Sequence, residues 1–389
     1  MLQAKTKSGY FITLASLTKA EIAHKRNQAF FCPMCNEQVI VRAGPHTIPH
    51  FAHQSKSTCP HSGGGESNYH EKGKFRIFQW LKNQGHQVEL EYYFPSIQQR
   101  PDVFLAISNK HIAIEYQCSR IPIQTIYKRT RAYDQLGITP LWILSAKLFK
   151  RLGNNRIKID TFLRHFIHHF STDTKPVLYF LCPNTNQILC FHHLYYNRVN
   201  QALGQITIMP LMAINFPELF SHQDYPMVKL YQDWKSEKRF FRIHRKNRLY
   251  GKERDWYNWL YEKRTHKEYV PSVIHVPVKG QHLMKTPPWD WQSRICLDII
   301  HPCGIGDTLT YKECRHLLYR YIHQPDYFPL MKIYIDPIKE YLNILVKEGT
   351  LQYIHEGKYK KRKHFSFYAT LEKALQGDVE LMDKLRLDA

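Results

Sequence analysis

The sequence contains 389 residues, of which 43% are hydrophobic and 14% aromatic, enough for two or three domains with buried cores. Lys and Arg number 55 against 33 Asp and Glu, so the formal net charge is +22, which favours a polyanionic partner such as nucleic acid. The sequence has no apolar run of about 18 residues, no leader-like N-terminus and no regular disulfide spacing among its nine cysteines, so we expect a cytoplasmic protein with no membrane partner.

Residues 1–65 have the composition of a small zinc-binding module. A strand at Tyr10–Leu14 and a helix at Leu17–Lys25 are predicted before a Cys-Pro-x-Cys turn that contains Cys32 and Cys35. Thiolates and imidazoles suit tetrahedral Zn²⁺, and a segment this small needs metal binding to become ordered. We expect a structural zinc site in which Cys32 and Cys35 are joined by two of three further residues, namely His50, His53 and Cys59. The alternative is a set of free cysteines in a small loop.

A helix is predicted over residues 66–82, directly after the flexible joint Ser62–Gly65. Glu66, His70 and Lys74 are spaced four residues apart and therefore share one face of this helix. Acidic, imidazole and ammonium groups on one face can serve a site for an anionic substrate. An ordinary solvated helix face explains the same spacing.

Two strands at 103–107 and 111–116 carry three polar residues at their ends. Asp102 stands at the entry of the first strand, and the two-residue period of the second places Glu115 and Gln117 on one face. A carboxylate at the end of a buried strand is costly unless a metal ion or a hydrogen-bond donor compensates it. Paired carboxylates that hold Mg²⁺ are what phosphodiester hydrolysis requires. A β-hairpin with two edge carboxylates is the alternative.

Three further elements complete this region: a strand at Val88–Phe94, a helix at Pro122–Gln135 and a strand at Leu141–Leu144. The predicted order is thus helix, three strands, helix, strand. In the second helix Arg129 and Tyr133 lie one turn apart, which suits binding of a DNA phosphate. A surface Arg packed on a Tyr ring has the same spacing.

Residues 151–225 predict a strand-rich extension, with a hairpin at Val177–Leu181 and Gln187–Phe191 and a strand at Ile206–Met209. Residues 229–264 interleave Lys and Arg with aromatic residues, as on a nucleic-acid surface. Because the aromatic spacing is partly three and four, amphipathic helices with aromatic core positions are the favoured interpretation.

The last hundred residues predict helices followed by a basic hairpin, which is the plan of a winged helix or of a helical bundle with an added hairpin. The predicted elements are helices at Tyr311–Ile322 and Pro337–Lys347, a strand at Leu351–Glu356, a basic turn at Lys358–Lys363 and a strand at His364–Tyr368. A winged helix docks on duplex DNA or on a partner protein, so a transcription regulator is one class of function to consider.

Pro101-Asp102 followed by Glu115-x-Gln117 resembles the PD-(D/E)xK nuclease signature, with Gln117 in the place of the usual Lys. Together with Cys-Pro-x-Cys and His-Phe-Ala-His in the first 65 residues, the chain resembles the competence protein CoiA family. The resemblance implies an α/β restriction-endonuclease-like core of αβββαβ order, an N-terminal zinc-binding module and a mostly helical C-terminal region. We therefore expect four segments: 1–65, 66–150, 151–225 and 226–389.

The resemblance also implies a DNA-processing protein of natural transformation, acting on incoming DNA during recombination. Asp102 and Glu115 would hold Mg²⁺ or Mn²⁺, with Glu66 or His70 assisting, and Lys74 would replace the charge that Gln117 lacks. The implied partners are single-stranded or branched DNA and recombination proteins. The alternative is a non-catalytic DNA-binding accessory protein that uses the same fold as a scaffold.

Overall fold

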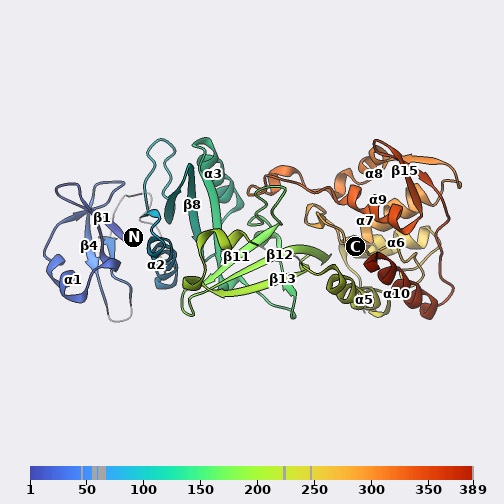
Figure 1. Ribbon diagram of the computed structural model, residues 1–389, viewed down its shortest axis with the longest axis horizontal. Helices are drawn as coiled ribbons and strands as arrows, with labels where there is room; N and C mark the ends of the chain where they lie inside the picture. Colours follow the sequence, from blue (N-terminus) through green and yellow to red (C-terminus); the bar gives the residue numbers. More distant parts are fainter. Residues whose placement is uncertain (45–46, 55–58, 60–66, 222–224, 246–247, 388–389) are drawn as a thin grey trace.

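A computed structural model describes residues 1–44, 47–54, 59, 67–221, 225–245 and 248–387. The chain is arranged along one long axis, with a small sheet at one end, a large sheet in the middle and a helical region at the other end (Figure 1). The predicted fold class, a mixed α/β core with an N-terminal module and a helical C-terminal region, is confirmed.

The N-terminal module is a five-stranded antiparallel sheet in the order β2-β1-β3-β4-β5, with one helix. Its core is small and includes two cysteines: Ala4, Leu14, Phe30, Cys32, Val39, Phe51 and Cys59. The elements are β1 (Gln3–Thr6), β2 (Phe11–Thr13), α1 (Lys19–Lys25), β3 (Phe30–Phe31), β4 (Gln38–Arg42) and β5 (His50–His53). The strand and helix predicted here are present, whereas the His-Phe-Ala-His segment is a strand that the sequence did not suggest.

The central unit is an eight-stranded mixed sheet in the order β10-β13-β12-β11-β9-β8-β7-β6. β8 pairs antiparallel with β7 and parallel with β9, and β9 pairs parallel with β11. The elements are α2 (Asn68–Asn83), β6 (Gln87–Leu90), β7 (Val103–Ile107), β8 (Lys110–Gln117), α3 (Ile123–Gln135), β9 (Thr139–Ser145), β10 (Arg156–Lys158), α4 (Thr161–Arg164), β11 (Val177–Cys182), β12 (Gln187–Arg198) and β13 (Gln201–Pro210). The order αβββαβ is present as predicted, and residues 151–225 add four strands to the same sheet.

The helices α2 and α3 cover opposite faces of this sheet. On one face Ile114 and Tyr116 of β8 pack in a core cluster with Ile77 of α2. On the other face Ala113 packs with Tyr133 of α3. The alternation of β8 therefore directs Glu115, like Ala113, toward α3.

The C-terminal region is a helical unit around three buried tryptophans, Trp234, Trp256 and Trp291, with a small sheet in the order β14-β16-β15. Its elements are α5 (Met227–Ile243), α6 (Gly251–Glu262), α7 (Pro288–Arg294), a π-helical continuation (Ile295–Ile300), β14 (Thr308–Thr310), α8 (Tyr311–Leu317), α9 (Pro337–Glu348), β15 (Leu351–His355), β16 (Lys358–Lys361) and α10 (Leu371–Leu387). Residues 229–264 were predicted to form amphipathic helices with aromatic core positions. Trp234 and Trp256 are buried as this interpretation requires, whereas Tyr261 is 84% exposed.

The basic hairpin differs from its prediction. The second strand is β16, within the segment expected to be the turn, and His364–Tyr368 does not form a strand. Gly357 lies between the two strands with φ +70°, a left-handed conformation that glycine adopts at little steric cost, so the chain reverses earlier than expected. The order of strand, two helices and hairpin is compatible with both plans that the sequence left open, a winged helix and a helical bundle with an added hairpin.

Candidate functional site

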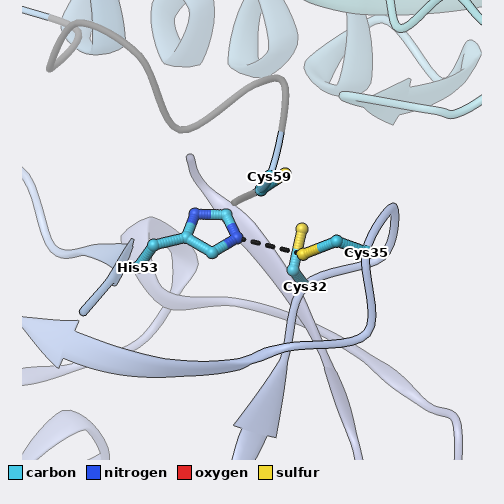
Figure 2. A group of neighbouring side chains, drawn as sticks. All are labelled: Cys32, Cys35, His53 and Cys59. Carbon is cyan, nitrogen blue, oxygen red and sulfur yellow. Dashed lines mark hydrogen bonds between the residues drawn. The ribbon is translucent and has the colours of Figure 1, made fainter. Parts of the chain in front are cut away.

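Four side chains of the N-terminal module converge in a metal-binding geometry (Figure 2). The ligand atoms of Cys32, Cys35, His53 and Cys59 all lie within 4.8 Å of one another. The turn after β3 brings the first two together, because the Cys32 N–H donates to the Glu37 carbonyl at 2.8 Å. His53 reaches them from the end of β5, and its Nε2 lies 3.3 Å from the Cys35 Sγ. Three thiol groups and one imidazole form a donor set that suits tetrahedral Zn²⁺.

His50, the fifth candidate, lies outside this cluster. Its Nδ1 contacts the Ile48 carbonyl at 2.9 Å and the Glu71 carboxylate at 3.4 Å. His50 and His53 are three residues apart on one strand, and side chains at that spacing point to opposite faces. Burial, followed by hydrogen bonds to Cys59 and Cys32, raises the pKa of Cys35 to about 12. A bound cation would favour the thiolate form of these cysteines.

Asp102 and Glu115 line one cavity of about 1160 Å³ on the central sheet. Asp102, at the entry of β7, accepts a hydrogen bond from the Tyr116 N–H at 2.8 Å and lies 3.2 Å from the His70 Nε2. Burial alone would raise its pKa, but His70 and the cationic Lys74 lower it to about 2. Asp102 is therefore ionised at neutral pH.

The pKa of Glu115 is shifted in the opposite direction to that of Asp102. It is 1% exposed, and its Oε1 lies 2.5 Å from both the Tyr133 hydroxyl, which donates to it, and the Arg129 guanidinium. Burial raises the pKa of Glu115 to about 7 despite the opposing charge of Arg129, and the charge of Asp102 raises it further. The two carboxyl groups thus differ in protonation near neutral pH, a pattern that is frequent in functional sites.

Arg129 and Tyr133, predicted as DNA-binding residues, both contact Glu115. Arg129 keeps 26% of its side chain exposed and lines the cavity, so it can reach a phosphate as well. Tyr133 is fully buried behind Glu115. The structure thus places one of these two residues at the cavity surface and the other beneath it.

Lys74 lies beneath the cavity with no exposed surface. Its Nζ is 2.6 Å from the Glu91 carboxylate and 3.9 Å from Asp102. The sequence did not point to Glu91, a buried residue directly after β6, although its carboxylate also accepts the Leu2 N–H at 2.9 Å. In this arrangement Lys74 acts on Asp102 through its charge and does not reach the cavity surface.

Gln117 lines the cavity, and its amide Nε2 donates to the Ser119 carbonyl at 2.7 Å. Two exposed lysines that the sequence did not single out, Lys128 and Lys147, line the same cavity. The Lys147 Nζ lies 4.2 Å from the centre of the Tyr69 ring. Lys147 follows β9, and the parallel pairing of β8 with β9 brings the ends of both strands to one edge of the sheet. The position of Lys147 shortly after the predicted strand 141–144 was therefore the signal in the sequence that could have identified it.

Glu66, the remaining candidate metal ligand, lies outside the described residues. Within the described ranges, the Cys₃His cluster is the one group of three or more His, Cys, Asp or Glu side chains close enough to hold a metal ion. Asp102, Glu115 and His70 therefore share a cavity without forming a further group of that kind. Two members of the Cys₃His cluster, Cys35 and Cys59, line the same cavity.

Comparison with known families covers most of the chain. Three family models match in order: "Competence protein CoiA, N-terminal domain" over residues 14–62, "Competence protein CoiA, nuclease-like domain" over 66–224 and "Competence protein CoiA, C-terminal domain" over 230–375. The chain belongs to the competence protein CoiA family.

A curated relative of this CoiA-family chain, "Competence protein CoiA" of Bacillus subtilis (strain 168), is 29% identical over 333 residues, which are 84% of this chain and 88% of the relative. The nuclease-like family model spans both 66–150 and 151–224, in agreement with the continuous eight-stranded sheet. Among the helices of the described residues, none has the length and apolar character needed to cross a bilayer.

Proposed function

We propose that this protein is a metal-dependent deoxyribonuclease that processes incoming DNA in the cytoplasm during competence and recombination. The observation that carries the proposal is the shared cavity of Asp102 and Glu115, in which one carboxyl group is ionised and the other titrates near neutral pH. Membership of a family with a nuclease-like domain supports the same conclusion.

Asp102 and Glu115 are the proposed ligands of Mg²⁺ or Mn²⁺, with His70 beside them. A bound cation would lower the pKa of a water ligand and stabilise charge on the phosphate. Tyr133 and Arg129 hold Glu115 in place through contacts at 2.5 Å. Lys74 is a positioning residue, because its charge keeps Asp102 ionised from below the cavity.

We propose that Lys128 and Lys147 supply the positive charge that Gln117 lacks. Both are exposed and line the cavity, so each can approach a DNA phosphate there. Gln117 is neutral and cannot act as a general base, but its side-chain oxygen can orient a water molecule. This assignment gives the phosphate-binding role to lysines on α3 and after β9.

The Cys₃His cluster is proposed to hold a structural zinc ion. Its donors are the usual ones for such a site, and the module around it has a core of few residues. Because Cys35 and Cys59 line the cavity, the zinc-bound module would form one wall of the DNA-binding site. We propose single-stranded or branched DNA as the substrate of this site.

The direct test is cleavage of labelled single-stranded, duplex and branched DNA in Mg²⁺ or Mn²⁺. Asp102→Asn and Glu115→Gln are expected to abolish cleavage while leaving the fold intact. Glu89→Gln is the matched control, since Glu89 is an exposed carboxylate on the adjacent β6 and lies outside the cavity. Cleavage that persists in both cavity variants would overturn the proposal.

A non-catalytic DNA-binding accessory protein is the second candidate. The observation that favours it is the close contact of Arg129 with Glu115, which already compensates the carboxylate without a cation. This function predicts that wild type, Asp102→Asn and Glu115→Gln bind DNA alike and that none of them cleaves it. It leaves a role for recombination proteins as partners.

A further inference from the structure

A second cavity, of about 330 Å³, lies where the central sheet meets the C-terminal helices. Its lining comes from the β12–β13 turn, the end of α5, the start of α6 and the segment that leads into α7. None of the residues proposed for phosphodiester cleavage lines it. The cavity is therefore a separate feature that needs its own explanation.

The walls of this cavity are aromatic. Trp256 of α6 and Trp289 of α7 lie with their ring centres 4.4 Å apart, and the Phe241 ring lies nearly parallel to Trp289 at 6.1 Å. Trp289 and Phe241 pack against the C-terminal core and remain only partly buried, so part of each ring can contact a ligand in the cavity. Flat aromatic faces of this kind bind other flat rings by stacking.

Several buried side-chain atoms of the lining have no hydrogen-bond partner among the described residues, namely the Asn197 Oδ1, the Thr286 Oγ1 and both ring nitrogens of His275. Asn197 is 1% exposed and donates through its amide to Glu237 at 2.5 Å, while its Oδ1 has no hydrogen-bond partner among the described residues. Thr286 is 3% exposed, and its Oγ1 likewise finds none there. A buried polar atom without a hydrogen bond is costly, which points to a ligand that supplies the missing contacts. The Asn197 Oδ1 can accept a hydrogen bond from a ligand, and the Thr286 hydroxyl can donate or accept one.

Charged side chains at the cavity favour an anionic ligand. Arg198 is exposed and lies 4.3 Å from the Phe240 ring centre, and Lys252 at the start of α6 is also exposed. The two buried acids in the lining are already compensated: Glu237 contacts Arg156, and Asp290 lies 2.8 Å from Arg294. Arg198 also lies 3.8 Å from the Glu237 carboxylate, but 43% of its side chain is exposed, so both Arg198 and Lys252 can contact a phosphate at the cavity.

We propose that this cavity binds one nucleotide, with its base stacked on Trp289 and Phe241, the base edge hydrogen-bonded to Asn197 and Thr286, and the phosphate at Arg198 and Lys252. A volume of about 330 Å³ is within the range of small-ligand pockets and suits a single nucleotide. The nucleotide is either one unpaired residue of a DNA strand or a free mononucleotide. The assignment of the nucleotide to a DNA strand rests on the proposed function, whereas the binding of a nucleotide in this cavity does not.

The test is a titration of the full-length protein, followed by tryptophan fluorescence. One arm uses deoxyadenosine monophosphate, the second a short single-stranded oligonucleotide, and the third the same oligonucleotide made abasic. Quenching by either base-containing probe, with at least tenfold weaker binding of the abasic strand, supports the proposal. Response to the oligonucleotide alone identifies a DNA strand as the source, and response to the mononucleotide alone identifies a free nucleotide.

Thr286→Val preserves side-chain shape and removes the hydrogen bond, so we expect base-dependent binding to weaken about five- to tenfold. Trp289→Leu removes a stacking face and is expected to weaken it at least tenfold. Tyr261→Leu is the matched control, because Tyr261 lies on α6 with 84% exposure and outside the cavity lining. Thermal unfolding of each variant confirms that it is folded.

Two results would overturn the inference: no binding of any base-containing probe, or binding that Thr286→Val and Trp289→Leu leave unchanged. Asp102→Asn separates this inference from the proposed function, because it is expected to abolish cleavage and to leave base binding at this cavity unchanged. Loss of cleavage together with retained base binding therefore supports both conclusions. Absence of cleavage in wild type with retained base binding would remove only the proposed nuclease activity.

Discussion

Gly73 in α2 allows the helix to approach β8 very closely at the candidate nuclease site. A Cβ atom at this position would lie 1.9 Å from Cε1 and 2.3 Å from Cδ1 of Tyr116. Tyr116 stands between Glu115 and Gln117 on β8, and its hydroxyl donates to the Leu181 carbonyl at 3.0 Å. The ring is therefore held at both ends, so Gly73→Ala must push the helix away from β8 and also displace the ring, which breaks this hydrogen bond.

The expected cost of Gly73→Ala follows from three effects. Overpacking of a core typically costs roughly 1–3 kcal/mol. Loss of the Tyr116 hydrogen bond, which leaves a buried carbonyl without its donor, costs roughly 1–3 kcal/mol. Alanine is about 1 kcal/mol better than glycine inside a helix. We expect the free energy of unfolding to fall by about 3 kcal/mol, measured by urea denaturation, and DNA cleavage to fall as α2 carries His70 away from Asp102.

Tyr116→Ala provides the control that isolates the steric contact. Without the ring, only the helix propensity remains, so Gly73→Ala should stabilise the Tyr116→Ala protein by about 1 kcal/mol. A change of sign between the two backgrounds is the signature of the close contact. If Gly73→Ala alters stability equally in both backgrounds, or by less than about 0.5 kcal/mol in wild type, the packing argument is wrong.

Three other outcomes follow from the structure. A chelator, or Cys59→Ser, should remove one zinc ion per chain and make the first 54 residues sensitive to protease; metal content that is unchanged in the variant would contradict the assigned ligands. Burial lowers the pKa of His168 to about 3, so the free energy of unfolding should fall as the pH drops below about 6.5. His168→Gln should lower the slope of unfolding free energy against pH by about 1.4 kcal/mol per pH unit. Equal slopes for wild type and variant in urea titrations from pH 6 to pH 4 would refute this. Because Lys128 and Lys147 are proposed to supply the positive charge, Gln117→Lys should leave the cleavage rate in Mg²⁺ within about twofold of wild type, and a rise of about tenfold would contradict that assignment.

The Cys₃His cluster shows which parts of a site the sequence can predict. The Cys-x₂-Cys spacing and the nearby His and Cys residues identified a set of five candidates, and four of them converge. The choice between His50 and His53 depends on β5, since side chains three residues apart on a strand face opposite sides. That strand was not recognised, although it pairs with the preceding β4, because His-Phe-Ala-His lacks the strict alternation of apolar and polar residues that marks a strand.

The central sheet gives a similar result. The predicted strands at 103–107 and 111–116 and the predicted helix at 122–135 follow from local apolar periodicity, and the structure has all of them as β7, β8 and α3. The compensation of Lys74 by Glu91 could not be inferred, because an ion pair between side chains 17 residues apart depends on how the helix packs against the sheet. The same holds for Lys147, which reaches the cavity because β9 pairs parallel with β8.

The sequence by itself predicted the helices and strands of the αβββαβ core, the donor chemistry of the Cys₃His cluster and the positions of Asp102 and Glu115 at strand ends. These properties depend on residue type and on spacing within a few residues, so periodicity and composition reveal them. Only the tertiary structure decided the opposite pKa shifts of Asp102 and Glu115, the close approach at Gly73 and the shared cavity that joins the metal module to the central sheet. Burial and charge at those sites come from groups distant in the chain, and it is folding that brings such groups within a few ångströms of one another.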